Sequence, residues 1–157
     1  VIEASETGEA RLVGPAQSAY EPSDAQLSWH LARFVEMIRA LPSDPIVVRQ
    51  NWLRAYDWAT QGGAQVLNAM AEEENPFDKV GKTTVAVEVL SVVRASPGSF
   101  QLRWRESTYS NGTLIDVERF TGVATIVIEP ASSPERLSKN PLGLYVHSFN
   151  WSRDLQQ

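Results

Sequence analysis

The sequence contains no cysteine, only two histidines, and no apolar run of the roughly eighteen residues that a membrane-spanning helix needs. Without cysteine there are no disulfides, no thiolate metal sites and no cysteine nucleophiles. Positive charge is also scarce, because 14 lysines and arginines are set against 19 acidic residues, for a net charge of -5. A direct nucleic-acid partner is therefore not expected, since such partners bind basic surfaces.

The motifs that bind phosphates, activate nucleophiles or hold metals are absent as well. The sequence has no Walker loop, no dinucleotide fingerprint and no nucleophile elbow. His30 and His147 lie far apart and have no acidic residue at a ligand-like spacing, so no metal and no cofactor is expected. His147 is a candidate general base, although a lone histidine on a strand is more often a half-exposed pairing residue.

The length of 157 residues fits one domain, because a chain of this size buries roughly 70% of its unfolded surface. Residues 1–21 are rich in small residues, glycine and acids without a sustained period, which indicates a linker or a loosely attached arm. We therefore expect a single domain over residues 22–157. The chain begins at Val1 rather than at methionine, so residues upstream of it are expected in the natural protein.

A first amphipathic helix is predicted to follow the arm. Ser23 and Gln26 have the spacing of a capping box. Apolar residues then recur at intervals of four and three, at Leu27, Leu31, Phe34, Ile38 and Leu41. A coiled-coil seam has the same spacing, but this pattern lasts only about two heptads, which favours a helix packed on the domain's own core.

Two more helices are predicted before any strand. Asp44 is a suitable N-cap for the second helix and Pro45 a suitable first residue, and the pair Gly62 and Gly63 should end it. The third helix should cover residues 64–74, because the Asn-Pro pair that follows cannot continue the helical hydrogen bonding.

After these helices the apolar period changes to two, which predicts antiparallel strands. The Asn111-Gly112 pair predicts a two-residue hairpin, and Gly122 is the expected place of a bulge or sharp bend. Helices followed by hairpin-linked strands predict an α+β fold, with the helices on one face of a bent, four-stranded antiparallel sheet. The four predicted strands lie at residues 83–93, 99–109, 114–128 and 144–151.

Two predictions concern which side chains the strands and helix ends expose. The runs Glu72–Glu74 and Arg103–Glu106 are predicted to lie at the surface, because helix-end acids and sheet-face arginines are usually solvated or ion-paired. The last strand is predicted to alternate regularly along its length. One face would carry Tyr145, His147, Phe149 and Trp151.

A curved sheet closed by helices can enclose a conical cavity, so an isomerase-like enzyme or a small-molecule binder is one functional alternative. The candidate side chains for such a site are Tyr56, Asp57 and Tyr109. Burial of Asp57 between its aromatic neighbours would raise the pKa of its carboxyl group. An exposed helix acid is the more common outcome, and the sequence does not choose between them.

Several segments, taken together and in order, resemble the TrbF branch of the bitopic inner-membrane scaffold proteins of type IV secretion and conjugation machines. The resemblance spans residues 23–155 and includes the Gly62-Gly63 pair. Its segments read DPIVVRQNWLRAY, NPFDKVGKTTVAVEVLSV, RWRE, ERFTG and NPLGLYVHSFNWSRDL.

The resemblance implies a nuclear-transport-factor-2-like fold and a non-enzymatic assembly subunit of the secretion channel. It implies a periplasmic domain that follows a single transmembrane helix of the bacterial inner membrane, absent before Val1. The implied partners are further copies of the chain, as a dimer, and other channel subunits. By the same resemblance, Asn140, Pro141, Leu142 and Gly143 form a loop associated with self-association.

A physical reason for such a role lies in the composition of this loop. Pro141 fixes one φ angle and restricts the residue before it, while Gly143 permits a turn with positive φ. Leu142, Leu144 and Tyr145 would then present apolar surface beside a stiff loop, as one half of a dimer patch. The alternative is that the loop only ends a turn.

Overall fold

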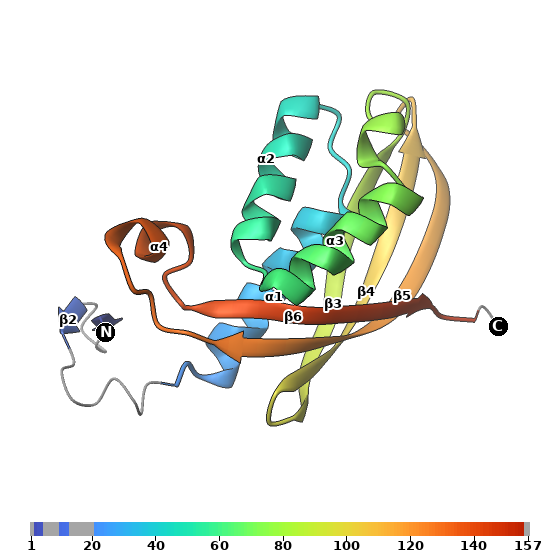
Figure 1. Ribbon diagram of the computed structural model, residues 1–157. Helices are drawn as coiled ribbons and strands as arrows, with labels where there is room; N and C mark the ends of the chain where they lie inside the picture. The colour runs from blue at the N-terminus through green and yellow to red at the C-terminus, as the bar shows by residue number, and fades with distance from the viewer. Residues whose placement is uncertain (1, 5–9, 13–20, 156–157) are drawn as a thin grey trace.

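The computed structural model describes residues 2–4, 10–12 and 21–155 (Figure 1). Its helices are α1 (Asp24–Arg39), α2 (Pro45–Asp57), α3 (Gln61–Glu73) and α4 (Pro134–Lys139), with a 3₁₀ turn, η2, at Pro76–Asp78. Its strands are β1 (Ile2–Ala4), β2 (Ala10–Leu12), β3 (Thr84–Ser96), β4 (Ser99–Ser110), β5 (Thr113–Ile128) and β6 (Leu144–Arg153).

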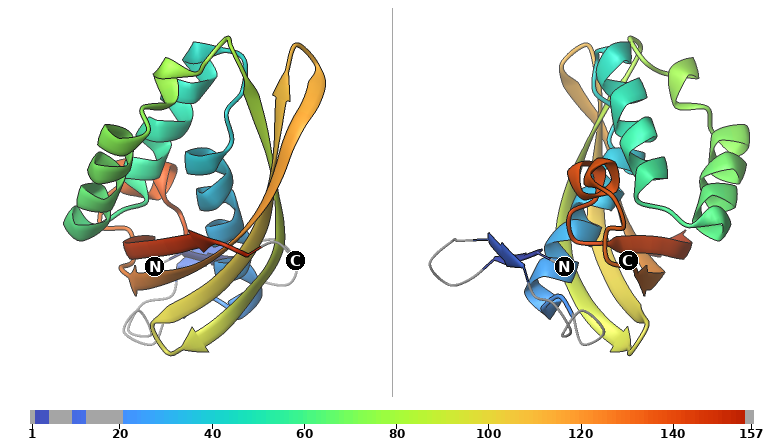
Figure 2. Two further views of the ribbon diagram at one scale, coloured as in Figure 1. Left: turned by 90° about the vertical axis from the view of Figure 1, so that its right-hand side faces the viewer. Right: turned by 60° about the vertical axis from the view of Figure 1, so that its left-hand side comes forward.

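The main sheet is antiparallel and has the order β3-β4-β5-β6, so spatial order follows sequence order. The sheet is strongly bent, and α1, α2 and α3 lie on one side of it (Figure 2). This arrangement confirms the predicted α+β architecture. The predicted arm over residues 1–21 falls mostly outside the described residues; within it, β1 and β2 pair as a separate two-stranded sheet.

Local signals form the first helices as predicted. Ser23 and Gln26 make the reciprocal hydrogen bonds of a capping box at the start of α1. At α2, the Asp44 carboxylate accepts the Ile46 N–H at 2.8 Å, and Pro45 occupies the first turn. No helix in the described part of the chain is long and apolar enough to cross a membrane.

The Gly62-Gly63 pair does not end α2, as the sequence had suggested, but lies in the first turn of α3. α2 ends at Asp57, and Thr60 caps α3 by accepting the Gly63 N–H at 3.1 Å. A Cβ added to Gly63 would overlap the carbonyl oxygen of Val146 on β6. Gly63 is therefore needed for the close approach of a helix to a strand rather than for a helix stop.

Gly122 carries no bulge itself, and the nearest register shift of β5 lies between Thr125 and Ile126. Gly122 pairs regularly with Leu102 and Trp151, and it makes room for the Trp104 ring, which a Cβ would meet at 3.0 Å. A register shift places an extra residue of β6, His147, between the pairs formed by Ser148 and Val146. The predicted regular alternation of the last strand is therefore wrong.

An aromatic cluster forms the centre of the core between α1 and the sheet. The Trp104 ring stacks on Phe120 and Phe149 with centroids 5.6 and 5.9 Å apart, and Phe34 of α1 meets Phe149 edge-on at 6.1 Å. The Asn111-Gly112 hairpin is confirmed, since both residues have positive φ. The bent sheet and this cluster position the segment that returns from β5 through α4 to β6.

Candidate functional site

The loop before the last strand begins at a short helix, α4, that was not predicted from the sequence. Ser133 caps α4 by accepting the Arg136 N–H at 3.1 Å, and Pro134 occupies its first turn. The signal for this helix was present, since serine followed by proline and glutamate is a helix start. Six residues are simply too few for a periodic pattern to appear.

Asn140 ends α4 and is the residue that shapes the loop. Its side chain is 1% exposed. The amide Nδ2 donates to the Leu144 carbonyl at 2.7 Å, and Oδ1 accepts the Gly143 N–H at 3.1 Å. The backbone N–H of Asn140 donates to the Arg136 carbonyl at 2.8 Å. One buried side chain thus closes the turn from the inside, which neither aspartate nor leucine would reproduce.

Gly143 has a φ of 71°, as the sequence predicted from its place after the proline. Its carbonyl accepts the Glu129 N–H at 2.8 Å, so the loop is also tied to the end of β5. A Cβ at Gly143 would overlap the Glu129 carbonyl oxygen. Any larger residue at this position strains the loop as well as altering its surface.

The apolar patch predicted beside this loop is largely turned inward. Leu144 is fully buried and Tyr145 is 8% exposed, while Leu142 is half-buried against the core. Tyr145 keeps one polar contact, in which its hydroxyl accepts from Arg136 Nη1 at 3.3 Å. Pro141 is the exposed member of the loop. The prediction that Leu144 and Tyr145 present apolar surface is wrong, because both complete the core of the domain.

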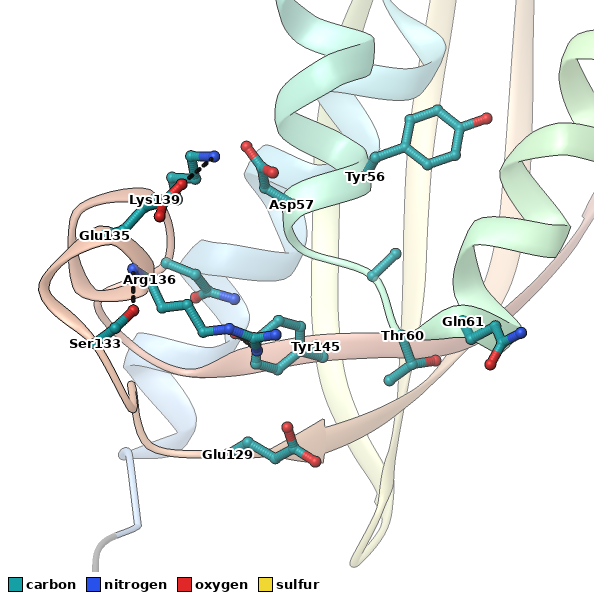
Figure 3. Close-up of a pocket in the computed structure, with 12 residues that line it drawn as sticks. Tyr56, Asp57, Thr60, Gln61, Glu129, Ser133, Glu135, Arg136, Lys139 and Tyr145 are labelled. Carbon is teal, nitrogen blue, oxygen red and sulfur yellow. Dashed lines mark hydrogen bonds and ion pairs between the residues drawn. The ribbon is translucent and has the colours of Figure 1, made fainter.

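A half-open pocket of about 580 Å³ lies next to the loop. Its wall combines the end of α2, the start of α3, the residue after β5 and most of α4 (Figure 3). The pocket therefore brings the sequence-predicted loop beside the Tyr56 and Asp57 of the enzyme alternative. The lining side chains carry charges of both signs, with Asp57, Glu129 and Glu135 set against Arg136 and Lys139.

The three residues of the enzyme alternative do not form a catalytic group. Tyr56 points toward α3 and away from Asp57 (Figure 3), and its hydroxyl donates to Asn68 Oδ1 at 2.5 Å. Burial raises the pKa of Tyr56 above its ordinary value. Asp57 is exposed, and Tyr109 lies on β4 outside the pocket.

His30, for which the sequence predicted no function, is buried among apolar side chains. Its ring stacks on Trp58 with centroids 3.6 Å apart, and it is 4% exposed. Nε2 of His30 has no hydrogen-bond partner within the described residues. Trp58 in turn donates from Nε1 to the Lys139 carbonyl at 3.0 Å, which joins the imidazole stack to the end of α4.

Burial lowers the pKa of His30 to about 4, so this residue should make the fold acid-sensitive. The unfolded chain, with a histidine pKa of about 6.5, binds the proton more tightly. The contribution of neutral His30 is therefore complete above pH 6.5 and is lost as the pH falls toward 4, by up to about 3 kcal/mol. Urea unfolding at pH 7.5 and pH 5 should show a smaller difference for His30→Phe than for the wild type. An equal pH dependence in both proteins would contradict this assignment.

No group of three potential metal ligands occurs within the described residues. His147 lies on the bulge of β6, where its Nδ1 is 2.9 Å from the Thr60 hydroxyl. It is exposed, and no acidic side chain pairs with it in the described structure.

Comparison with known proteins places these features in a family. The profile of the VirB8 protein family matches residues 1–154. The chain belongs to the VirB8 family.

A curated relative of this VirB8 chain is the conjugal transfer protein TrbF of Rhizobium radiobacter, 28% identical over 99% of the chain and 72% of the relative. Among solved structures, Agrobacterium tumefaciens VirB8 superposes with a TM-score of 0.71 and 16% identity, covering 88% of this chain and 99% of that one. The TrwG component of Bartonella birtlesii superposes with a TM-score of 0.73 and 18% identity, covering 88% and 96%. These matches confirm the resemblance to type IV secretion proteins and the nuclear-transport-factor-2-like fold.

The domain also contains a buried ion pair, part of which was predicted to lie at the surface. Arg39, in the last turn of α1, binds Glu106 of β4 with Nε–Oε2 and Nη2–Oε1 distances of 2.6 and 2.9 Å. Trp104 Nε1 donates to the same carboxylate at 2.8 Å. The surface prediction holds for Arg103, which is exposed, but is wrong for Glu106, which is 9% exposed. Strand alternation contained the signal, because Glu106 is in phase with the buried residues Phe100, Leu102 and Trp104.

Proposed function

We propose that this VirB8-family chain is a non-enzymatic assembly subunit of a type IV secretion channel used in conjugal transfer. It self-associates and bridges channel components in the periplasm. The observation that carries this proposal is the family match over residues 1–154, together with the conjugal transfer function named for the TrbF relative. The separation of Tyr56, Asp57 and Tyr109 supports a role that needs no chemistry.

The proposal includes a membrane anchor. Residues 1–21 connect the domain at residues 22–157 to a single helix in the inner membrane, upstream of Val1. Anchoring confines copies to a plane and raises their effective concentration, so a weak dimer suffices for assembly. Other subunits of the channel then bind the self-associated domains.

The self-association surface is assigned to the loop and flank at Asn140–Tyr145. Within it, Pro141 is the exposed contact, and the buried Asn140, Gly143, Leu144 and Tyr145 hold it at a fixed height and angle. A surface braced by the core loses little conformational entropy on binding, which favours its use as an interface. The alternative function, binding or isomerising a small molecule, would use the adjacent pocket and Asp57.

Mating frequency from a donor strain tests the two functions against each other. The gene is deleted and restored as wild type, Pro141→Arg, Asp57→Ala or Pro97→Arg, with expression checked in each strain. Pro97 is an exposed proline in the β3–β4 turn and serves as the matched control. We expect deletion to abolish transfer, and Pro141→Arg to lower transfer and dimerisation at least about tenfold, since one desolvated charge costs more than 1.4 kcal/mol. Asp57→Ala and Pro97→Arg should transfer normally.

Gly143→Arg is a poor test of the interface, because the clash at Glu129 makes it a folding variant as well. Loss of transfer with Asp57→Ala alone would favour the pocket function. If the Pro141→Arg chain sediments as a dimer, as the wild type does, then the Asn140–Tyr145 loop is not part of the self-association interface.

A further inference from the structure

β3 is an edge strand of the main sheet, and part of its free edge is open. At the start of this edge, the Val85 N–H donates to the Leu41 carbonyl at 2.9 Å and the Val85 carbonyl accepts the Leu41 N–H at 3.0 Å. Successive residues of a strand direct their backbone groups to alternate edges. The ladder between β3 and β4 is regular from Val85 to Val89. Val87 and Val89 therefore direct their N–H and C=O groups away from β4, as Val85 does.

Among the residues that the structure describes, these backbone groups have no partner on the free side. No backbone hydrogen bond joins Val87 or Val89 to any described segment beyond β4. Two donors and two acceptors are thus available at positions two residues apart. A bulge at Leu90 interrupts the edge immediately afterwards, which limits how far an added strand can pair.

α1 turns this open edge into a groove. The groove has a volume of about 450 Å³, and its two walls are one face of α1, from Ser28 to Glu36, and residues 87–92 of β3. Trp29 of α1 is 61% exposed and Leu90 of β3 is 44% exposed, so apolar surface lies on both sides. Exposed aromatic surface beside unpaired strand groups is typical of a peptide-binding edge.

The charges along the groove are matched within the chain. Arg33 pairs with Glu36 at 2.7 Å, and its guanidinium lies 5.2 Å from the centre of the Trp29 ring. At one end Arg94 pairs with Asp24 at 2.9 Å. On the sheet, Glu88 pairs with Arg105. A charged ligand would have to displace one of these pairs, whereas an uncharged ligand would not.

We propose that this groove binds an extended, uncharged segment of a partner polypeptide, which adds to β3 as a fifth strand of the sheet. The segment's backbone bonds to Val87 and Val89, and an apolar side chain packs against Trp29 and Leu90. Only a polypeptide backbone supplies alternating donors and acceptors at the spacing of this edge. The groove and the Asn140–Tyr145 loop are separate surfaces, so this inference stands whether or not the chain self-associates.

A phage-displayed library of random heptapeptides, selected on the purified chain of residues 1–157, tests the proposal. The enriched peptides should be uncharged, with alternating apolar or β-branched residues. In hydrogen exchange followed by NMR, the Val87 and Val89 amides should exchange rapidly in the free chain and slowly with a selected peptide bound. The Ala86 and Glu88 amides, which face β4, should be protected in both states.

Two variants separate the backbone contribution from the apolar wall. Val89→Pro removes an N–H that faces the free edge and leaves the ladder with β4 intact, a position where proline is tolerated. Trp29→Ala removes the exposed indole from the α1 side of the groove and leaves the buried core unchanged. Each should weaken peptide binding by about tenfold, the effect of one lost hydrogen bond or aromatic contact. Leu53→Ala, at an exposed residue of α2, should bind like the wild type.

Several outcomes would overturn the proposal. They are failure to enrich any peptide, enrichment of acidic or basic peptides, or unchanged binding by a folded Val89→Pro variant. Protection of Val87 and Val89 that grows with protein concentration alone would mean that a second copy occupies the edge. If Val89→Pro does not fold, Trp29→Ala decides, and wild-type affinity in that variant counts against the groove.

Discussion

Replacing Glu106 with leucine should lower the free energy of unfolding by about 3–5 kcal/mol, the typical cost of leaving one partner of a buried ion pair uncompensated. Arg39 would lose both charged hydrogen bonds while its guanidinium stays packed near the rings of Phe120 and Trp151, at 5.1 and 5.5 Å. The indole N–H of Trp104 would lose its acceptor as well. Urea or thermal unfolding of the purified chain measures this change.

The double variant Arg39→Met with Glu106→Leu provides the control. It removes both charges and replaces them with apolar groups of similar length, so its stability should return to within about 1–2 kcal/mol of the wild type. Glu88→Leu, which breaks the exposed pair with Arg105, should cost no more than about 1 kcal/mol. A Glu106→Leu variant as stable as Glu88→Leu would show that the carboxylate is not buried as the structure has it.

Replacing Gly63 with alanine should cost about 3 kcal/mol or more, although alanine is the better helix former. The added Cβ would overlap the Val146 carbonyl, which is itself fixed because it accepts the Thr60 N–H at 3.0 Å. The Val146 N–H also donates to the Trp58 carbonyl at 2.8 Å, so the strand cannot move away without breaking this second bond.

The neighbouring glycine is a matched control in the same turn. A Cβ at Gly62 would meet the His147 Cε1 atom at 3.0 Å and the His147 carbonyl oxygen at 3.1 Å, which are tight contacts rather than the overlap found at Gly63. Because the better helix propensity of alanine offsets these tight contacts, the stability of Gly62→Ala should stay within about 1 kcal/mol of the wild type. Equal effects of the two substitutions in thermal unfolding would mean that helix propensity, not contact with β6, governs this turn.

The parts of the fold that sequence predicted correctly are those set by neighbours along the chain. The capping box at Ser23, the N-cap at Asp44 and the Asn111-Gly112 hairpin each depend on residues within a few positions of one another. Strand alternation also placed the inner face of β4 correctly. These local signals, taken in order, were sufficient for the α+β class.

The errors arise where a distant segment decides. Gly63 looked like a helix stop, but a glycine is needed there because the Val146 carbonyl of β6, more than eighty residues away, leaves no room for a Cβ. Leu144 and Tyr145 looked like surface because they flank a stiff loop. The bulge at His147 instead turns Leu144 toward the core, and Tyr145 is buried where it lies against Arg136 of α4. Strand alternation placed Glu106 in phase with the buried residues of β4, but no short-range pattern connects it to its partner, Arg39 of α1, so the charged side chain was assigned to solvent.

The conformation of the loop at Asn140–Gly143 was predicted in part, while its role in self-association stays a prediction. The sequence located the loop and the positive φ of Gly143, and the structure adds the pocket that brings α2 and α4 beside it. The inward-facing Asn140 amide was not predicted, since its two hydrogen bonds depend on the closed geometry of the loop.

The sequential order of the four main strands has a consequence for how the domain forms. Each strand pairs with the one before it, so the sheet can grow hairpin by hairpin, with only the β5–β6 connection containing a helix. Such pairings close short loops and have low contact order, which favours rapid formation. The slow step should then be docking of α1, α2 and α3, because α1 (Asp24–Arg39) meets β3 (Thr84–Ser96) only through contacts between residues tens of positions apart in the sequence. The sheet should therefore form before the helical layer closes over it.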